Sequence, residues 1–514
     1  MDRLGDGVVD PARVANDIMI QAHIRPFLGA AQKVAWAALL FTLPVTSFPY
    51  FPPALGGDAL VRPLAVYPLI LLGVLAVLPA LFIRPVSRTV LTLLPFVLIA
   101  LVSSLASLLR GIEPALGISV EARVLRGVIT LAIGCAFYVT IATFPQTRQD
   151  LDFSLRWIYA GGLAALFWGS LQAAGIFFSS QSLFAFLEKA QTYISIRPLR
   201  PDRISGLTYE PHWFAEQMIL LLLPWTLAAA LNGYSVYRWR WRWLSVEWLI
   251  VGWCILLLPF TYSRAGLLNL AILVFLSVIF FRPSKNNHLP NEVVKQNAAR
   301  RLAGWGKRRL VEAVIVLGIV LIPIYLIGDR NPFFARIWGY WKQPQASLSG
   351  YLSYLGFDAR LVYGQAAFNT YLAYPVLGVG LGNYAFYFEE MLPYRPIAEV
   401  PEVLHMVTPE PGRDRLITSK NLYLRLLAET GIVGATAYLA FVIAHVGCAI
   451  YLWLSIDRRW QYWGTASLCG LLAFALSAMT FDSFVIPNTW VVFGLICAAT
   501  RVMMQPLSSH GETE

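Results

Sequence analysis

The sequence predicts an all-α polytopic membrane protein with about twelve transmembrane helices and a large extracytoplasmic loop. Two observations lead to this fold class. Of the 514 residues, 57% are hydrophobic and only 13% are charged, and the mean hydropathy is +0.60, which excludes an ordinary soluble domain. The apolar residues also gather in runs of about 20, the length that a helix needs to cross a bilayer core of roughly 30 Å.

The predicted spans are spread along most of the chain. Ser263 and Arg264 lie in the few residues that separate the seventh span from the eighth, and both of these spans are short. All five cysteines fall inside predicted spans, so the sequence indicates neither a disulfide framework nor a zinc site. The spans lie near residues 34–50, 64–84, 89–109, 124–145, 155–178, 213–232, 246–260, 265–281, 310–328, 432–454, 462–480 and 485–503.

The basic residues indicate how the chain crosses the membrane. The formal net charge is +11, and Lys and Arg concentrate in the loops 233–245, 282–309 and 455–461. These loops satisfy the positive-inside rule if they and both termini are cytoplasmic. The excess charge is then a topology signal with some contact to anionic lipid head groups, and we expect no nucleic acid partner.

The spans and loops divide the chain into five predicted segments. The loop 329–420 balances its charges and is rich in Tyr, Trp and Pro, so we expect an ordered subdomain on the outer side, with a helix from about 358 to 373 capped by Asp358. The five segments are a cytoplasmic N-terminal segment (1–33), transmembrane helices 1–9 (34–328), the outer loop subdomain (329–420), an interfacial helix start with transmembrane helices 10–12 (421–503), and a cytoplasmic tail (504–514).

Two arginines lie at predicted helix N-termini on the outer side. Arg264 follows Ser263, which is placed to cap the eighth span, and Arg360 lies in the first turn of the loop helix. Free backbone N–H groups and the helix dipole favour an anion there, and a guanidinium binds phosphate oxygens in bidentate fashion. Both residues are therefore candidate phosphate clamps. The alternative is that each only extends to lipid head groups.

The stretch 200–217 leads into the sixth span and carries a further group of polar residues. Arg203 precedes a Ser-Gly turn, and Glu210 and His212 flank Pro211 at the helix entrance. A partly desolvated carboxylate there has a raised pKa and suits a general base or acid. The alternatives are that Glu210 pairs with Arg203 and only holds the loop, and that His212 is satisfied locally.

The stretch 417–434 forms the entrance to the tenth span. Lys420 and Asn421 lie in the first turn of the predicted helix, on the same side of the membrane as Arg264 and Arg360. Arg425 and Glu429 continue the polar stripe that Asn421 begins, at a spacing of four residues. We interpret the last two as a weak contact on an interfacial helix.

Four ordered motifs carry a resemblance to a known family. They are SRAG (263–266), RLVYGQAA (360–367), PVLGVGLGNY (375–384) and KNLYL (420–424) followed by ETGIVG (429–434). Together they resemble the O-antigen ligase and polysaccharide polymerase family of bacterial membrane glycosyltransferases over roughly residues 200–440. One departure is that the family usually has His-Asn where this chain has Lys420-Asn421.

The resemblance implies a GT-C-like fold and a glycosyltransferase at the periplasmic face of the bacterial inner membrane. The donor would be a glycan on undecaprenyl diphosphate and the acceptor a hydroxyl of a second glycan, joined by direct displacement with inversion. Arg264 and Arg360 would neutralise the departing diphosphate, and Glu210, or a Lys420 with a depressed pKa, would take the proton. No metal or other cofactor is expected, because cationic side chains take the place of a divalent ion. The expected substrate-binding residues are Arg203, Tyr209, His212, Asn421 and Tyr384.

The missing histidine favours a polysaccharide polymerase over an O-antigen ligase that transfers the glycan to a lipid A core. The alternative from another class is a lipid-linked oligosaccharide transporter or flippase, for which a similar number of spans is typical. Besides donor and acceptor, the expected partners are membrane lipids and a chain-length regulator or flippase of the same pathway.

Overall fold

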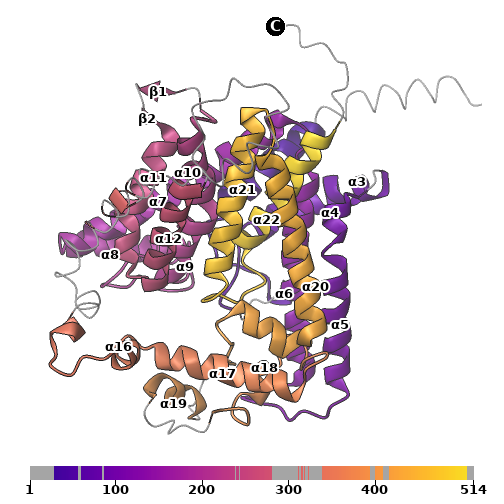
Figure 1. Cartoon of the computed structure of the whole chain (residues 1–514), viewed down its shortest axis with the longest axis vertical. Helices are drawn as coiled ribbons and strands as arrows, with labels where there is room; N and C mark the ends of the chain where they lie inside the picture. Colours follow the sequence, from indigo (N-terminus) through magenta and orange to yellow (C-terminus); the bar gives the residue numbers. More distant parts are fainter. Residues whose placement is uncertain are drawn as a thin grey trace, which may run out of the picture.

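A computed structural model describes residues 28–55, 59–83, 86–237, 239–241, 244–280, 339–393, 400–408 and 416–505, with single residues between 311 and 322. Most of the described chain is helical, and long helices form a bundle with a layer of short helices across one end (Figure 1). The basic loop 282–309, most of the ninth predicted span and most of both terminal segments lie outside the described residues.

Each of the other predicted spans contains a helix of the bundle. Pro44 lies just beyond the first of these helices, and Pro224 lies inside the sixth predicted span. The helices, in chain order, are Leu28–Thr42, α2–η2–α3 (Val66–Ile83), α4–α5 (Arg88–Leu108), α6 (Val120–Thr143), α7 (Arg148–Phe177), α9–η3–α10 (Pro211–Asn232), α11–η4 (Val246–Thr261), α12 (Arg264–Phe280), α20 (Leu422–Trp453), α21 (Arg458–Ser477) and α22 (Pro487–Met504).

Six of these helices are long and apolar enough to cross a membrane by length and composition. They are Val66–Ile83, Arg88–Leu108, Val120–Thr143, Arg148–Phe177, Pro211–Asn232 and Leu422–Trp453. The prediction of a mostly helical membrane protein is thereby confirmed, and the count of twelve spans stays a prediction. The described part of the loop 233–245 carries a small antiparallel hairpin, β1 (Arg240–Trp241) with β2 (Leu244–Ser245).

Short helices form the layer across the lower end of the bundle in Figure 1. The predicted loop helix is present as α17 (Phe357–Ala373), but Gly356 in the left-handed conformation, and not Asp358, occupies its N-cap position. The other elements of the layer are η5 (Tyr340–Lys342), α16 (Leu348–Tyr354), α18 (Tyr384–Tyr387) and α19 (Pro401–Val407), whereas α8 (Gln181–Gln191) packs against α7. Tyr363, Phe388 and Val403 form a separate core that packs against Ala428 of α20.

The glycine motif 375–384 pairs with the backbone of α20, where that helix is interrupted at Gly431. Val379 N donates to Ala428 O and Gly380 N to Glu429 O, each at 2.9 Å, and Ile432 N donates to Pro375 O at 2.8 Å. The interruption frees the backbone groups that these bonds use. It also divides α20 close to residue 432, where the sequence predicts the tenth span to begin.

Left-handed backbone makes the alternating glycines of this motif necessary. Gly380 has φ +93°, and an added Cβ would lie 2.7 Å from Ser107 Oγ. Residues with a side chain pay about 1–3 kcal/mol in such a conformation, apart from the steric overlap.

We therefore expect Gly380→Ala to lower the unfolding temperature of the purified protein by destabilising the contact between the motif and α20. The expected loss is about 1–3 kcal/mol. Gly447→Ala is the matched control, because Gly447 lies in the helical part of α20 with nothing within 4 Å of an added Cβ. A Gly380→Ala protein that unfolds at the same temperature as the Gly447→Ala protein would contradict this account.

Candidate functional site

Arg264 lies at the start of α12, as the sequence predicts, and reaches the layer of short helices. Ser263 Oγ accepts a hydrogen bond from Gly266 N at 3.1 Å and so caps the helix. Nη1 of Arg264 donates to the carbonyl oxygen of Leu355, in the short turn between α16 and α17. Arg360 lies one turn into α17 and is exposed. The two predicted clamps thus border the same helix junction.

Lys420 belongs to a cluster with residues of α17 and α19. Its Nζ lies 2.7 Å from Glu402 Oε1 and 4.4 Å from the centre of the Tyr363 ring. Tyr363 OH also donates to Glu402 Oε1, at 3.2 Å. Burial favours a higher pKa for Glu402, but Lys420, Tyr363 and Arg360 outweigh it and lower that pKa. Lys420 is therefore a hydrogen-bond donor to a carboxylate, which fits the binding of phosphate or sugar better than proton abstraction.

Asn421 and Tyr384 are held by the protein itself. Asn421 is the N-cap of α20, because its side-chain oxygen accepts from Leu424 N at 3.1 Å. The prediction that Lys420 and Asn421 lie in the first turn is therefore wrong, since the helix begins at Leu422. Asn421 Nδ2 donates to Met479 O at 3.2 Å. Tyr384 is buried, and its OH donates to Tyr363 O at 2.8 Å. These contacts hold the two side chains in place. A direct role in binding substrate stays a prediction for both residues.

Glu210 lies at the N-cap of α9 between two partners. It pairs with Arg197, and its Oε2 lies 2.9 Å from His212 Nδ1. Burial favours a higher pKa, but the hydrogen bonds and charges of His212 and Arg197 prevail and lower the pKa of Glu210 to about 2. The expectation of a raised pKa is wrong, because the sequence did not reveal Arg197 as a partner. A carboxyl group with such a pKa is a weak base.

Tyr209 and Arg203 lie in the same stretch of the chain as Glu210. The Arg197 guanidinium lies over the Tyr209 ring, 4.8 Å from its centre. Arg203 Nε lies 3.4 Å from Asp202 Oδ2. The salt bridge to Glu210 is made by Arg197, so the alternative that Glu210 pairs with Arg203 is wrong. The structure thus gathers Tyr209, Glu210 and His212 around Arg197.

The turn 478–484 between α21 and α22 connects the two regions. Asp482 Oδ2 accepts from the backbone N of Lys420 at 2.9 Å. The Phe481 ring lies 6.3 Å from the ring of His212 and 5.9 Å from that of Trp213, measured between centres. Sequence reasoning missed Asp482, although an acid between two apolar runs is a signal that could have found it.

Arg425 and Glu429 are buried, with side-chain exposures of 10% and 5%. Arg425 Nε lies 2.9 Å from Glu429 Oε2, Nη1 donates to Asp482 O, and the guanidinium lies over the Phe484 ring. The predicted contact is present, but the expectation that it is weak and lies on an interfacial helix is wrong, because both side chains are buried. Helical spacing places the two residues together but does not reveal that the turn 478–484 packs on Arg425. Breaking such a buried pair costs about 3–5 kcal/mol.

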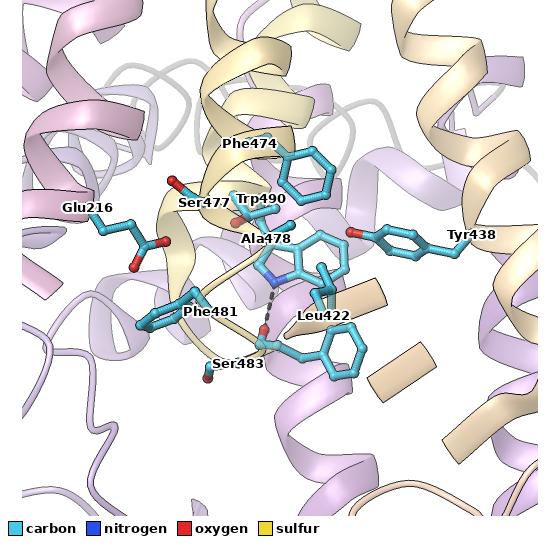
Figure 2. A pocket seen from close by; sticks show the side chains of 11 residues that line it. Glu216, Leu422, Tyr438, Phe474, Ser477, Ala478, Phe481, Ser483 and Trp490 are labelled. Atoms are coloured by element: carbon cyan, nitrogen blue, oxygen red, sulfur yellow. Dashed lines mark hydrogen bonds between the residues drawn. The ribbon is translucent and has the colours of Figure 1, made fainter. Parts of the chain in front are cut away.

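A pocket lies between the turn 478–484 and the helices α9, α20 and α22 (Figure 2). Glu216 of α9 lines it from one side and Tyr438 of α20 from the other, and Trp490 of α22 lies between them. The full lining is Glu216, Leu422, Tyr438, Phe474, Ser477, Ala478, Phe481, Ser483, Phe484, Thr489 and Trp490. Glu216 stands in the apolar run of the sixth predicted span and is not among the residues predicted for the site. Among the residues that the structure describes, no group of three or more His, Cys, Asp or Glu side chains is placed to hold a metal ion.

Residues 249–439 match the family model described as O-antigen ligase. These residues belong to the O-antigen ligase family. The match runs from α11 into α20, so it includes Arg264, Arg360 and Lys420, and it confirms the resemblance that the sequence motifs indicate. The match indicates a membrane enzyme of the O-antigen ligase or polymerase type. A comparison with curated proteins gives no match.

We expect Glu210→Gln to destabilise the protein at neutral pH, because Arg197 and His212 lose their carboxylate. The pKa of Glu210 falls from its usual 4.5 to about 2 on folding, so the carboxylate stabilises the folded state above pH 4.5 and loses this effect as the pH falls toward 2. The loss at pH 7 is on the order of 2–3 kcal/mol.

Unfolding temperatures of wild type and Glu210→Gln, taken between about pH 7 and pH 3, check this prediction. The difference should shrink as the pH falls. Glu188→Gln, at an exposed position of α8, is the control and should match the wild type. Equal unfolding temperatures for Glu210→Gln and wild type at pH 7 would contradict the stabilising ion pair.

Proposed function

We propose that the protein is a polysaccharide polymerase. It joins oligosaccharide repeat units carried on undecaprenyl diphosphate at the periplasmic face of the inner membrane. The observation that carries this proposal is the convergence of charged helix entrances at one end of the bundle. Arg264 contacts the turn before α17, and Lys420 contacts Glu402 of α19. Cations grouped in this way suit a substrate with a diphosphate between lipid and sugar.

The proposed orientation agrees with the arrangement of the loops. The hairpin β1–β2 in the basic loop 233–245 lies at the end of the bundle opposite α17 (Figure 1). If the basic loop is cytoplasmic, the layer of α16 to α19 lies in the periplasm. The proposal includes cytoplasmic termini, about twelve membrane crossings and a GT-C-like fold.

The proposed reaction is a direct displacement at the anomeric carbon of the donor. The acceptor hydroxyl attacks, the bond from carbon to the diphosphate oxygen breaks, and the configuration is inverted without a covalent intermediate. Arg264 and Arg360 stabilise the negative charge that develops on the diphosphate, an effect that typically accelerates a reaction by about 10²–10³ per donor. Lys420 binds phosphate or sugar by exchanging part of its contact with Glu402.

An O-antigen ligase is the second candidate, because the matching family carries that description. The two functions differ only in the acceptor, which is a growing polysaccharide for the polymerase and a lipid A core for the ligase. Both use the same donor and the same cationic residues.

Arg264→Ala and Arg360→Ala should each lower the transfer rate by about 100-fold or more, because the leaving diphosphate loses a charge partner. The measurement is glycan transfer by purified, folded protein from a lipid-linked oligosaccharide. Arg458→Ala, at an exposed position at the start of α21, is the control and should keep the wild-type rate. Unchanged transfer in both arginine variants would rule out the proposed site.

A second experiment separates the two candidate functions. Wild-type protein is incubated with lipid-linked oligosaccharide alone, and the products are separated on a gel. We expect a ladder of products, because a polymerase uses the same molecule as donor and acceptor. A product that forms only after a lipid A core acceptor is added would identify a ligase instead.

A further inference from the structure

The helix α17 carries an apolar stripe on the side opposite its own core. Its buried side chains, among them Tyr363 and Ala366, pack with residues of α18, α19 and α20. Its exposed apolar side chains are spaced i, i+4, i+11 and i+15, which places them on one face of the helix. They are Phe357, Leu361, Phe368 and Leu372, and we call them the α17 stripe.

The apolar surface continues from α17 onto α20. Val376 follows shortly after the end of α17 and is 59% exposed. Its carbonyl oxygen accepts a hydrogen bond from Val433 N at 3.4 Å, and Pro375 O accepts one from Ile432 N at 2.8 Å. Because the side chains of Ile432 and Val433 are also exposed, these bonds bring Val376 to the apolar surface of α20.

The exposed side of α20 is the side that acyl chains would cover. The helix is long and apolar enough to cross a membrane, and only 28% of its most apolar stretch is buried. Its exposed Ile432, Leu439, Ile443 and Ile450 are spaced i, i+7, i+11 and i+18, so they lie on one face. At 1.5 Å per residue this face is about 27 Å long, close to a hydrocarbon core of roughly 30 Å. Ile432 therefore marks the boundary between acyl chains and head groups, and α17 lies next to this boundary.

Aromatic side chains in the layer of short helices fit the same level. Trp341 of η5 and Tyr354 of α16 are both exposed. The Trp341 ring lies 4.9 Å from that of Tyr351, and the Tyr354 ring lies 5.3 Å from that of Tyr340, measured between centres. Trp and Tyr are enriched where acyl chains meet water, because their rings are apolar and carry a polar group. The layer thus exposes the residue types that a membrane interface favours.

A lipid surface explains the stripe better than a protein partner. A partner on the far side of the layer would account for exposed apolar side chains on α17, since such patches commonly mark interaction sites. It would not account for the continuation through Val376 onto a face of α20 that has the length of a bilayer core. One continuous lipid surface accounts for both.

We propose that α17 is an interfacial helix whose stripe lies against the lipids of the adjacent leaflet. Interfacial helices of this kind bury their apolar face about 5–10 Å into the boundary between head groups and acyl chains. The contact holds α17, and with it the exposed Arg360 next to Leu361, at the level of the lipid phosphates. The inference needs only that α20 crosses a bilayer, so it does not rest on the proposed reaction.

The test measures the accessibility of spin labels in full-length protein reconstituted into nanodiscs of phosphatidylethanolamine and phosphatidylglycerol. Labels are attached to Leu361→Cys and Leu372→Cys, whose native side chains are 54% and 60% exposed, so neither substitution removes a core residue. Ile443→Cys on the exposed face of α20 is the lipid reference. Glu390→Cys, at an exposed acid that follows α18, is the water reference. Wild type treated with the same label corrects for native cysteines.

Each label is tested with oxygen, which concentrates in acyl chains, and with a nickel chelate, which stays in water. For the two stripe labels we expect nickel collision rates at least about threefold lower than for Glu390→Cys, because lipid excludes the chelate. Their oxygen collision rates should approach that of Ile443→Cys. If the two stripe labels disagree, Phe368→Cys, which lies between them, decides by the same criterion.

Two results would overturn the inference. Nickel collision rates less than about threefold below the water reference would place the stripe in water. Low collision rates with both reagents would show that protein covers the stripe, either another segment of the chain or a second copy.

Discussion

The end of the bundle that carries α16 to α19 depends on a buried guanidinium group. Arg425 cannot be removed from water without partners, because an uncompensated charge in such a place costs several kcal/mol. It finds them in Glu429, one turn further along α20, and in the carbonyl oxygen of Asp482. Because Arg425 needs these partners, the first turn of α20 is held against the turn 478–484. The same turn holds Lys420 through the Asp482 carboxylate and contacts His212 through Phe481.

Backbone pairing extends this constraint to the layer of short helices. The interruption of α20 at Gly431 leaves backbone groups that the motif 375–384 uses. Ser103 Oγ of α5 donates to Leu377 O of this motif and also to Glu429 O. The loop that precedes α18 is thus tied to two helices of the bundle. The proposed site at α17 and Lys420 would therefore present a fixed surface, which suits preorganised electrostatic stabilisation.

The sequence predicted those features that depend on local chemistry. Apolar runs located the helices, Ser263 was recognised as a cap, and the helix before Pro375 begins within one residue of the expected start. Features that depend on tertiary packing were missed or misread. Nothing near Glu210 indicated that Arg197 would lower its pKa, and helical spacing did not reveal that the turn 478–484 packs on Arg425. The partners Glu402 and Asp482 come from distant segments that only the fold brings to Lys420.

The backbone at Lys420 has a consequence for how such enzymes diverge. Lys420 adopts φ +54°, a left-handed conformation that favours His, Asn and Asp among residues with side chains. The Asp482 carboxylate holds this conformation through the main-chain N–H, so the hold does not depend on which side chain is present. Evolution can therefore exchange a histidine for a lysine at this position while the turn keeps its shape. The chemistry offered to a substrate changes, but the scaffold that presents it does not.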